Sequence, residues 1–392
     1  MTTEALRTPV SLRALTGVFL LCWVVAALFP LAWIATMSFK LPVDAFAADP
    51  AQVVFGPATL AGAGGLGVAD LLLGIAALIA LYQAVARLTP RLARRIGGAF
   101  GWLAATVMTV LAAFILGAFV LPAVLRAIDP FLGVLGRPVI GATAAHYVSV
   151  WVGHQFYRNF ENSLLVTAGV VTVSLSVGTL AGYALARSTT GLALGLLTVA
   201  LIFRALPYSV LVSGYLPLFI GSADLLKPLW NAPVIGAVLH LFGPSPPTLY
   251  GRPWAVIAVL VSINQPFTIW MLRSFFANIP AELDEAARVD GCSHFEAFRR
   301  VIMPVMWPGV ITTGLFSFLL AYNDYLVCAL LLDAQSQTMV PAITQYFNRE
   351  TTSTDQIEAV AAAVSITAPL FVLVMAFQRQ IVSGLTTGAV KG

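Results

Sequence analysis

The sequence predicts an all-α polytopic membrane protein, and three observations predict it. Hydrophobic residues make up 59% of the 392 residues, and Asp, Glu, Lys and Arg together make up only 10%. Soluble domains carry about 25% charged residues, so the charge present here is too small to cover a soluble surface. The apolar residues also gather in long runs separated by short polar segments. We therefore expect lipid to surround most of the chain.

Eight apolar runs are long enough to cross a bilayer as helices, which takes about 20 residues each. The first run follows Arg7 and Arg13, as in a signal peptide. A cleavable signal has an apolar region of only about 7–15 residues, so we interpret this run as a retained anchor. The predicted spans are Ala14–Met37, Gly64–Ala86, Ala99–Leu125, Ser163–Ala186, Leu192–Leu216, Trp254–Phe276, Val310–Leu332 and Glu358–Phe377.

The distribution of basic residues sets the orientation of these spans, because cytoplasmic loops carry an excess of Lys and Arg. With the N-terminus inside, 13 of the 21 Lys and Arg residues fall in cytoplasmic segments and 7 in outer segments, while Arg204 falls inside the fifth span. The strongest cluster, Arg87 to Arg95, lies between the second and third spans. Eight spans then place both termini in the cytoplasm.

Composition argues against several other classes of protein. The basic residues lie in short loops, whereas a nucleic-acid-binding domain gathers them on one face. The three cysteines lie far apart without metal-ligand spacing, so we expect neither a metal site nor a disulfide framework. None of the three lysines stands in the phosphate-binding sequence G-x-x-x-x-G-K-[ST]. We therefore expect this chain to bind no cofactor itself. The cysteines are Cys22, Cys292 and Cys328, and the lysines are Lys40, Lys227 and Lys391.

Residues 279–304, between the sixth and seventh spans on the predicted cytoplasmic side, have the sequence pattern of two short helices. Pro280 suits the first position of a helix, and three acidic residues follow in the first turns, where the helix dipole favours negative charge. Gly291 suits the left-handed residue that follows a helix end. Ser293 and Glu296 form a capping box that starts the second helix.

The second predicted helix is amphipathic. Its apolar residues share one face, two arginines point away from that face, and two prolines end the helix and begin the next span. This pattern fits either a helix lying on the inner leaflet or a docking element with an exposed aromatic face. The apolar residues are Phe295, Phe298 and Ile302, the arginines are Arg299 and Arg300, and the prolines are Pro304 and Pro308.

This segment resembles the cytoplasmic EAA loop of ABC importer permeases. The signature of that family is Glu-Ala-Ala, then a Gly, then Ile-x-Pro. In that family the loop is the coupling helix, which sits in a groove of the ATPase subunit and receives its closing motion. The resemblance implies the same role here, with Phe295 as a further contact. The matching residues are Glu285, Ala286, Ala287, Asp290, Gly291, Ile302 and Pro304.

Other stretches resemble the carbohydrate-uptake branch of these permeases, and in particular its smaller, maltose-type membrane subunit. The resemblance covers about residues 14–40 and 160–392, and its C-terminal part is similar to the maltose-type tail that reaches between the ATPases. The stretches that carry it are Met37–Lys40, Asn162–Thr167, Tyr322–Tyr325 and Phe377–Gly392.

The resemblance implies the transmembrane domain of a type I ABC importer, with one departure. The family usually has six spans, whereas residues 64–125 here hold two additional spans, and an even number of added spans preserves the orientation of the core. We therefore divide the chain into an N-terminal span and outer loop (1–60), an inserted pair of spans (61–127), a permease core (128–377) containing the cytoplasmic coupling loop (278–309), and a cytoplasmic tail (378–392).

The partners follow from the same resemblance. We expect a second permease subunit, two ATPase subunits that hold ATP and Mg²⁺, an extracytoplasmic sugar-binding protein, a sugar substrate and membrane lipid, but no nucleic acid. The chain is then a multi-pass protein of the bacterial inner (plasma) membrane without an ATPase site of its own. An α-glucoside or other disaccharide is the expected sugar.

Two ionisable residues are placed inside predicted spans, where such groups normally face the bundle interior or a wet cavity. Arg204 falls near the middle of the fifth span and Asp324 near the middle of the seventh. One interpretation is structural, with either an ion pair between them or hydrogen bonds between helices. The other is a polar lining for the sugar path, formed by Arg204, Asn264, Gln265, Tyr322, Asn323 and Asp324.

Three alternatives remain open from the sequence. The first is a permease for another solute, such as glycerol phosphate. The second is a secondary transporter, which would more naturally show repeated halves with broken helices. The third is an intramembrane enzyme, which would need clustered acids or a His/Glu metal set, whereas the four histidines are scattered.

Overall fold

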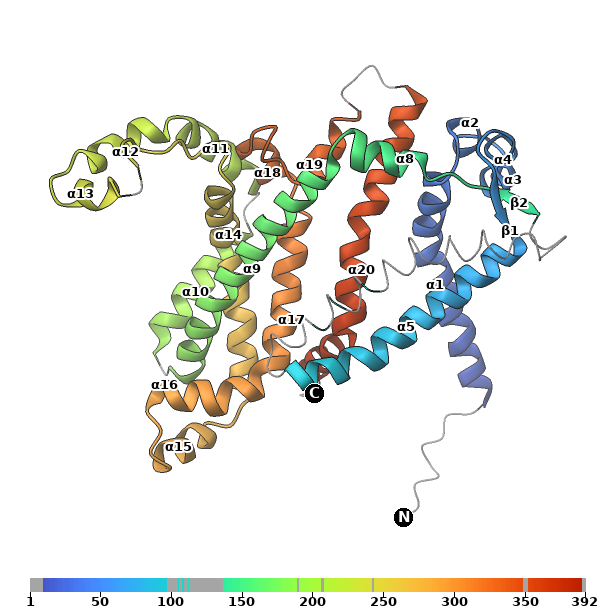
Figure 1. Cartoon of the computed structure of the whole chain (residues 1–392). Coiled ribbons are helices and arrows are strands. Elements are labelled where there is room, and N and C mark those ends of the chain that lie inside the picture. The colour runs from blue at the N-terminus through green and yellow to red at the C-terminus, as the bar shows by residue number, and fades with distance from the viewer. Residues whose placement is uncertain are drawn as a thin grey trace, which may run out of the picture. The chain divides into compact units, whose positions relative to one another are not determined.

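The computed structural model describes residues 10–96, 137–188, 190–205, 208–241, 243–347 and 352–389, together with the single residues 105, 108 and 112. These segments are mostly helical (Figure 1). The chain divides into two compact units, which are described separately. Unit 1 comprises Met1–Ile79, Leu116–His154 and Tyr346–Thr367, and unit 2 comprises Ala80–Ile115, Gln155–Gln345 and Ala368–Gly392.

Unit 1 contains the long helix α1 and a small folded segment packed at one end of it (Figure 1). A pair of short antiparallel strands, β1 and β2, closes this segment, with Gly65 opposite Gly141. Two helices, α5 and α20, begin in unit 1 and continue into unit 2. The elements are α1 Val10–Ser38, α2 Pro42–Ala45, α3 Pro50–Phe55, α4 Pro57–Ala63, β1 Gly65–Gly67, α5 Val68–Ile96, β2 Pro138–Gly141, α8 Ala145–Val148, the π-helix η4 Ser149–Gly153 and α20 Ser353–Ala389.

A buried lysine and a buried aspartate hold the small segment together. The Nζ of Lys40, which is 1% exposed, donates to the carbonyl oxygens of Val54 at 2.7 Å and Gly141 at 2.5 Å. Asp44 accepts from the backbone N–H and the hydroxyl of Thr59 at 2.6 and 2.7 Å. Burial lowers the pKa of Lys40, and the nearby charge of Asp44 partly offsets this effect. Lys40 therefore joins residues 54 and 141, which are distant in sequence.

Replacing Lys40 with methionine is expected to destabilise this segment. The change removes the donor to two carbonyl groups, and a buried polar group left without its hydrogen bond costs about 1–3 kcal/mol. Thermal unfolding of the detergent-solubilised protein and the rate of proteolysis between residues 41 and 64 measure the effect. Lys227→Met is the matched control, because Lys227 is 62% exposed and forms a surface ion pair with Asp224. Equal behaviour of the two variants would contradict this role for Lys40.

The start of α20 is joined to η4 by two polar contacts within unit 1. His154 Nε2 lies 3.0 Å from Glu358 Oε2, and Trp151 Nε1 donates to Ser365 Oγ at 2.9 Å. Glu358 is 6% exposed, so this carboxylate gains a partner where water reaches it poorly. These contacts fix the entry of α20.

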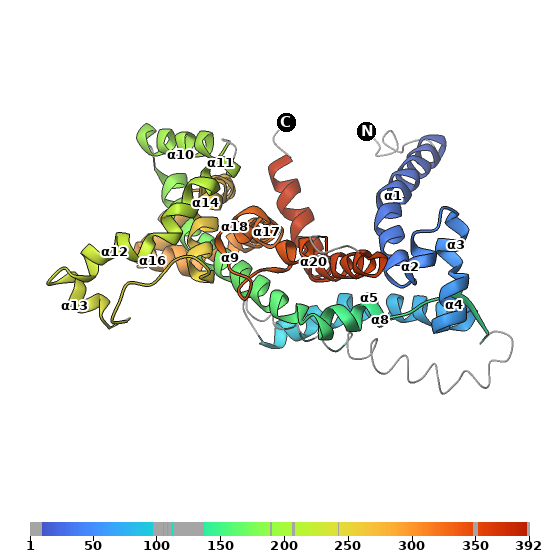
Figure 2. The same ribbon diagram turned by 90° about the horizontal axis from the view of Figure 1, so that it is seen from above.

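Unit 2 is organised around α9, α14 and α17, which pack side by side. Seen from above, α14 lies between α17 and α10 (Figure 2). Its elements are α9 Phe156–Arg187, α10 Gly191–Arg204, α11 Tyr208–Ile220, α12 Ser222–Trp230, α13 Ile235–Leu239, α14 Pro253–Ala277, α15 Glu282–Val289, α16 His294–Ala297, the π-helix η5 Phe298–Ile302, α17 Met303–Tyr322, α18 Leu326–Leu331 and α19 Met339–Thr344, with the end of α20.

Small residues let α9 and α14 approach closely. Gly178 and Gly182 are one helical turn apart on α9, in the G-x-x-x-G pattern of membrane helix pairs. A Cβ at position 178 would lie 2.7 Å from Cγ2 of Thr268, and one at 182 would lie 3.1 Å from the backbone N of Arg273. The two helices can therefore pack this closely only because both positions are glycine.

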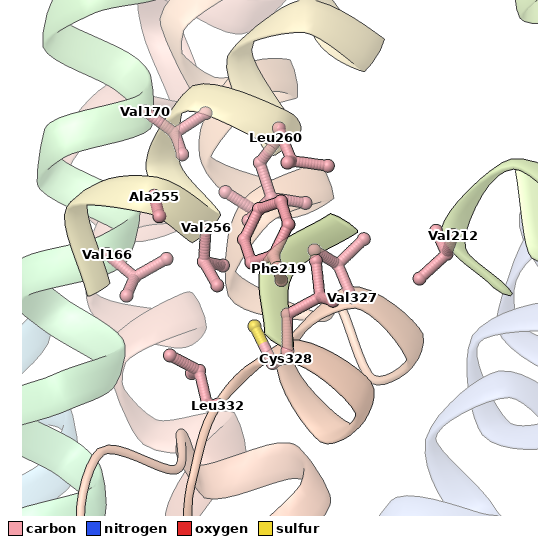
Figure 3. Packing of buried hydrophobic residues seen from close by; sticks show 13 residues of the cluster. Val166, Val170, Val212, Phe219, Ala255, Val256, Leu260, Val327, Cys328 and Leu332 are labelled. Atoms are coloured by element: carbon pink, nitrogen blue, oxygen red, sulfur yellow. The ribbon is translucent and has the colours of Figure 1, made fainter. Parts of the chain in front are cut away.

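An apolar cluster joins the first half of α9 to α14, α11 and α18 (Figure 3). Val166 and Val170 of α9 and Val256 and Leu260 of α14 meet Phe219 of α11 there. The segment of α18 completes the cluster with Val327, Cys328, Leu331 and Leu332. In a membrane bundle such packing stabilises the helices chiefly through van der Waals contact.

Four helices among the described residues are long and apolar enough to cross a membrane. Three of them confirm the first, fourth and sixth predicted spans as helices, and the fourth helix overlaps the seventh. These four are Leu12–Ser38, Phe156–Arg187, Pro253–Ala277 and His294–Tyr322. The third predicted span, Ala99–Leu125, lies outside the described residues apart from three single positions.

The seventh span differs from the prediction at both ends. The helix ends at Tyr322 rather than Leu332, because Asn323 and Asp324 leave it and Asp324 Oδ1 accepts from the backbone N–H of Val327 at 2.9 Å. Such local side-chain bonds compete with helix continuation. At the other end, α16 runs through η5 into α17 without interruption at Pro304. The π-helical turn η5 directly precedes Pro304, and such turns are a usual place for an irregularity in the helical hydrogen bonding.

The fifth and second predicted spans also differ from the helices in the structure. The run Leu192–Leu216 is two helices, α10 and α11, with Pro207 between them in the sequence. The 14 residues of α10 reach only about 21 Å, less than the roughly 30 Å hydrocarbon core. The cluster Arg87 to Arg95, predicted as a loop, continues α5 to Ile96, since Arg, Leu and Ala are good helix formers. Likewise, α20 extends past Phe377 to Ala389.

Candidate functional site

The first helix of the coupling loop, α15, ends in a complete left-handed cap. Gly291 has φ +90°, and its N–H donates to the carbonyl of Arg288 at 3.0 Å. The N–H of Cys292 donates to the carbonyl of Ala287, also at 3.0 Å. This pair of bonds is the Schellman motif, which satisfies carbonyls that a helix end leaves free. The predicted left-handed conformation of Gly291 is confirmed. The predicted start of the helix at Pro280 is wrong, because the helix begins two residues later, at Glu282.

The second helix begins with the predicted capping box. Ser293 Oγ accepts from the N–H of Glu296 at 3.3 Å, and Glu296 Oε2 accepts from the N–H of Ser293 at 3.1 Å. The backbone hydrogen bond from Ser293, followed by its hydroxyl and the charge of Arg300, lowers the pKa of Glu296. Arg299 and Arg300 are exposed, as predicted. The turn between α15 and α16 is therefore defined on both sides.

An apolar cluster seats the loop on the ends of the bundle helices. Phe298 and Ile302 of η5 are 9% and 0% exposed and pack with Leu272 and Phe276 of α14. Phe295, predicted to share their face, is 63% exposed. The prediction that the three residues form one exposed face is therefore wrong. The ring of Phe295 contacts that of Phe298, with centroids 6.3 Å apart, so Phe295 forms the exposed edge of the buried apolar cluster.

A polar contact that the sequence analysis did not anticipate joins α15 to α9. Asp284 Oδ1 accepts from the hydroxyl of Tyr183 at 2.6 Å, and Oδ2 accepts from Nε of Arg187 at 2.7 Å. Another guanidinium nitrogen of Arg187 donates to the carbonyl of Phe276 at 3.3 Å. In the sequence, only the spacing of Tyr183 and Arg187, one turn apart at the end of the fourth span, hinted at a polar contact. That spacing could not identify Asp284 as the partner, because Asp284 is 97 residues or more away in sequence.

The outward surface of the coupling loop combines acidic and apolar side chains. Glu285, Ala286 and Asp290 are exposed, and so are Leu283 and Val289, the latter at 88%. Ala287 is buried against η5 and Gly291 forms the cap, so these two shape the loop rather than its surface. Pro304 is exposed in the first turn of α17. With Phe295, this surface offers apolar side chains beside carboxylates.

Two residues of the predicted polar lining lie between helices. Asn264 is fully buried, and its Nδ2 donates to Ser317 Oγ at 2.8 Å. Gln265 donates to the carbonyl of Ser174 at 3.3 Å. The side-chain oxygens of Asn264 and Gln265 are buried without a hydrogen-bond partner among the described residues. Asn264 thus holds α14 to α17.

The other four residues of the predicted polar lining lie apart from one another or point to different partners. The guanidinium of Arg204, in the last turn of α10, lies 4.8 Å from the ring centroid of Phe267. Tyr322 is 2% exposed, whereas Asn323 is exposed and donates to the carbonyl of Leu319. Asp324 caps α18 instead of lying mid-span. The structure thus gives Arg204 and Asp324 separate partners, and the ion pair that one interpretation proposed between them is not formed.

Residues 174–387 match the family model described as "Binding-protein-dependent transport system inner membrane component". The chain belongs to this family. The permease is 34% identical over 252 residues to the diacetylchitobiose uptake system permease protein DasC of Streptomyces coelicolor, covering 64% of this chain and 81% of DasC. It is 30% identical to the trehalose transport system permease protein SugB of Mycobacterium tuberculosis, covering 64% of this chain and 82% of SugB.

Among solved structures, the permease is similar to a chain of a bacterial alginate ABC transporter in complex with alginate pentasaccharide-bound periplasmic protein. The TM-score is 0.44 at 16% identity, and the likeness covers 70% of this permease and 91% of that chain.

The family match identifies the permease as a membrane subunit of a transport system rather than an enzyme. It begins inside α9 and ends inside α20. The coupling loop and the six residues of the predicted polar lining lie within it, while residues 61–127 lie outside. The sequence resemblance to ABC importer permeases is confirmed by this match and by the relatives.

Proposed function

We propose that this permease is a membrane-spanning subunit of an ATP-driven sugar importer, with an α-glucoside or other disaccharide as substrate. It forms the translocation path with a second permease subunit, receives sugar from an extracytoplasmic binding protein, and is coupled to two ATPase subunits that hold ATP and Mg²⁺. The names of the two relatives support the sugar class, because diacetylchitobiose and trehalose are both disaccharides.

The coupling loop is the observation that carries this proposal. It is a compact, doubly capped unit that presents Glu285, Val289 and Phe295 to the outside while its inner face is seated on α14. An exposed apolar surface rimmed by charge is typical of a protein–protein contact. When the ATPases close, they displace this unit, and the bundle switches between inward- and outward-facing states, as in other rigid-body transitions.

The topology that accompanies this function has eight spans with both termini in the cytoplasm. The core, residues 128–377, carries transport, and the pair of spans within 61–127 is an addition to it. Among the six polar residues proposed for the sugar path, Asn323 is supported by its exposure and Arg204 by its partial exposure. Asn264, Tyr322 and Asp324 are buried, so they would support the path from behind.

Uptake by the reconstituted complex tests this function. Proteoliposomes containing the permease, its partner permease and the ATPases receive the binding protein with labelled trehalose, maltose, diacetylchitobiose or glycerol 3-phosphate. We expect ATP-dependent accumulation of at least one disaccharide and none of glycerol 3-phosphate. Accumulation of glycerol 3-phosphate alone would contradict the sugar class. Accumulation driven by an ion gradient without the ATPases would contradict the importer itself.

A further inference from the structure

The contact between Asp284, Tyr183 and Arg187 has a particular place in the chain. The backbone already ties α15 to α14, through residues 278–281, and to α17, through α16 and η5. No such tie exists for α9, which ends at Arg187 and continues into α10. Asp284 supplies the missing connection, because both of its carboxylate oxygens are bonded to side chains of the last turns of α9.

We propose that Tyr183, Arg187 and Asp284 form a latch that carries the displacement of α15 to α9. This inference rests on the proposed function, because it assumes that ATPase subunits move α15. Through the latch, a single push on the coupling loop moves α9, α14 and α17 together. The three residues are positioning residues, because their proposed role is to join α9 to α15 through their mutual hydrogen bonds.

The environment of the latch makes it strong. The side chains of Arg187 and Asp284 are only 22% and 15% exposed, and hydrogen bonds between charged groups are roughly twice as strong as neutral ones. The ring of Tyr183 packs against Phe276 and Phe298, with centroids 5.6 and 4.9 Å apart. The aromatic contacts hold the hydroxyl in place, so the latch is pre-organised.

The latch also leaves little room for substitution. The NH2 nitrogen of Arg187 is buried without a partner among the described residues. Removing the carboxylate of Asp284 would therefore leave a partly buried guanidinium that has lost its counter-charge, a situation more costly than the loss of one exposed ion pair. Loss of Asp284 should consequently release α9 from α15 rather than allow a substitute contact.

Two spin labels test the latch directly. Ala184 of α9 and Arg288 of α15 are exposed and flank the contact, so both are changed to cysteine and labelled. The exposed and half-buried cysteines, Cys22 and Cys292, are replaced by alanine, and the buried Cys328 stays. Dipolar broadening is measured in the complex with its ATPases, before and after trapping with ATP and vanadate.

With the latch intact, we expect the same broadening in both states, because α9 and α15 move as one body. In Asp284→Ala, trapping should reduce the broadening, since α15 moves away from α9. Tyr183→Phe, which removes one hydrogen bond and keeps the ring, should show a smaller change in the same direction. Glu282→Ala is the matched control, as an exposed acid two residues away in the same first turn, and should behave like the wild type.

Exchanging the two charges of the latch distinguishes a specific contact between these residues from a general contribution to stability. Arg187→Asp combined with Asp284→Arg should restore constant broadening, whereas either change alone should not. The latch is overturned if trapping alters the wild-type broadening, or if Asp284→Ala leaves it constant. If the wild-type permease does not co-purify with ATPase subunits, the proposed function fails together with the latch. If the permease co-purifies with ATPase subunits but α9 and α15 move independently of each other, only the latch is overturned.

Discussion

Replacing Gly291 with proline is expected to uncouple ATP hydrolysis by the partner ATPases from sugar uptake. Proline holds φ near −65°, whereas Gly291 has φ +90° and donates its N–H to Arg288. The variant therefore loses the cap that sets the angle between α15 and α16. We expect uptake to fall at least about tenfold, which corresponds to roughly 1.4 kcal/mol of lost coupling, while the ATPases remain active. Uptake and phosphate release measured in the same proteoliposomes check this.

Two further variants distinguish the effect of the backbone shape of the loop from the effect of its surface charge. Gly291→Asn should retain most of the uptake, because asparagine is the residue that best replaces glycine in a left-handed cap. Glu285→Lys should uncouple as Gly291→Pro does, since Glu285 is exposed on α15 and its charge faces the proposed partner. Glu282→Lys, an exposed acid earlier in that helix, is the control for charge alone. Full uptake by both Gly291→Pro and Glu285→Lys would count against the coupling role.

Local chemistry made much of the coupling loop predictable. Gly291 and the capping box of Ser293 and Glu296 depend on residues within one or two turns, and the structure confirms both. The long apolar runs of α1, α9 and α14 were equally visible, because the membrane sets their length. Errors arose where polar side chains or prolines act against the apolar pattern. Asp324 ends the seventh span by capping α18, although the residues after it remain apolar.

The latch shows why part of the site was not predictable. Tyr183 and Arg187 lie at the end of one span, and Asp284 lies in a loop beyond two further spans. An acidic residue in a first helical turn is already explained by the helix dipole, so the sequence offered no reason to seek a distant partner. Similarly, Asn264 has the polarity expected of a sugar path, and only helix packing shows that it bonds to Ser317.

The second large effect is expected from Gly182→Leu, which should separate α9 from α14. A Cβ at position 182 already lies within 3.0–3.3 Å of Leu272 and Arg273, and two of the three nearest atoms belong to the backbone of α14. Backbone atoms cannot rotate out of the way as a flexible side chain can. Overpacking a closely packed interface costs about 1–3 kcal/mol, and sometimes more. We therefore expect strongly reduced thermal stability of the solubilised protein and a low yield of assembled complex.

The consequence extends from packing to function, because α9 and α14 both contact the coupling loop. Phe276 of α14 packs against Phe298, and Arg187 of α9 bonds to Asp284. Gly182→Ala, which adds only the Cβ, should show a smaller loss of stability and partly reduced coupling. Gly195→Leu in α10 is the matched control, since a Cβ there meets no atom within 4 Å, and it should leave both properties unchanged. Equal stability of Gly182→Leu and Gly195→Leu would show that the close approach of α9 and α14 does not limit the fold.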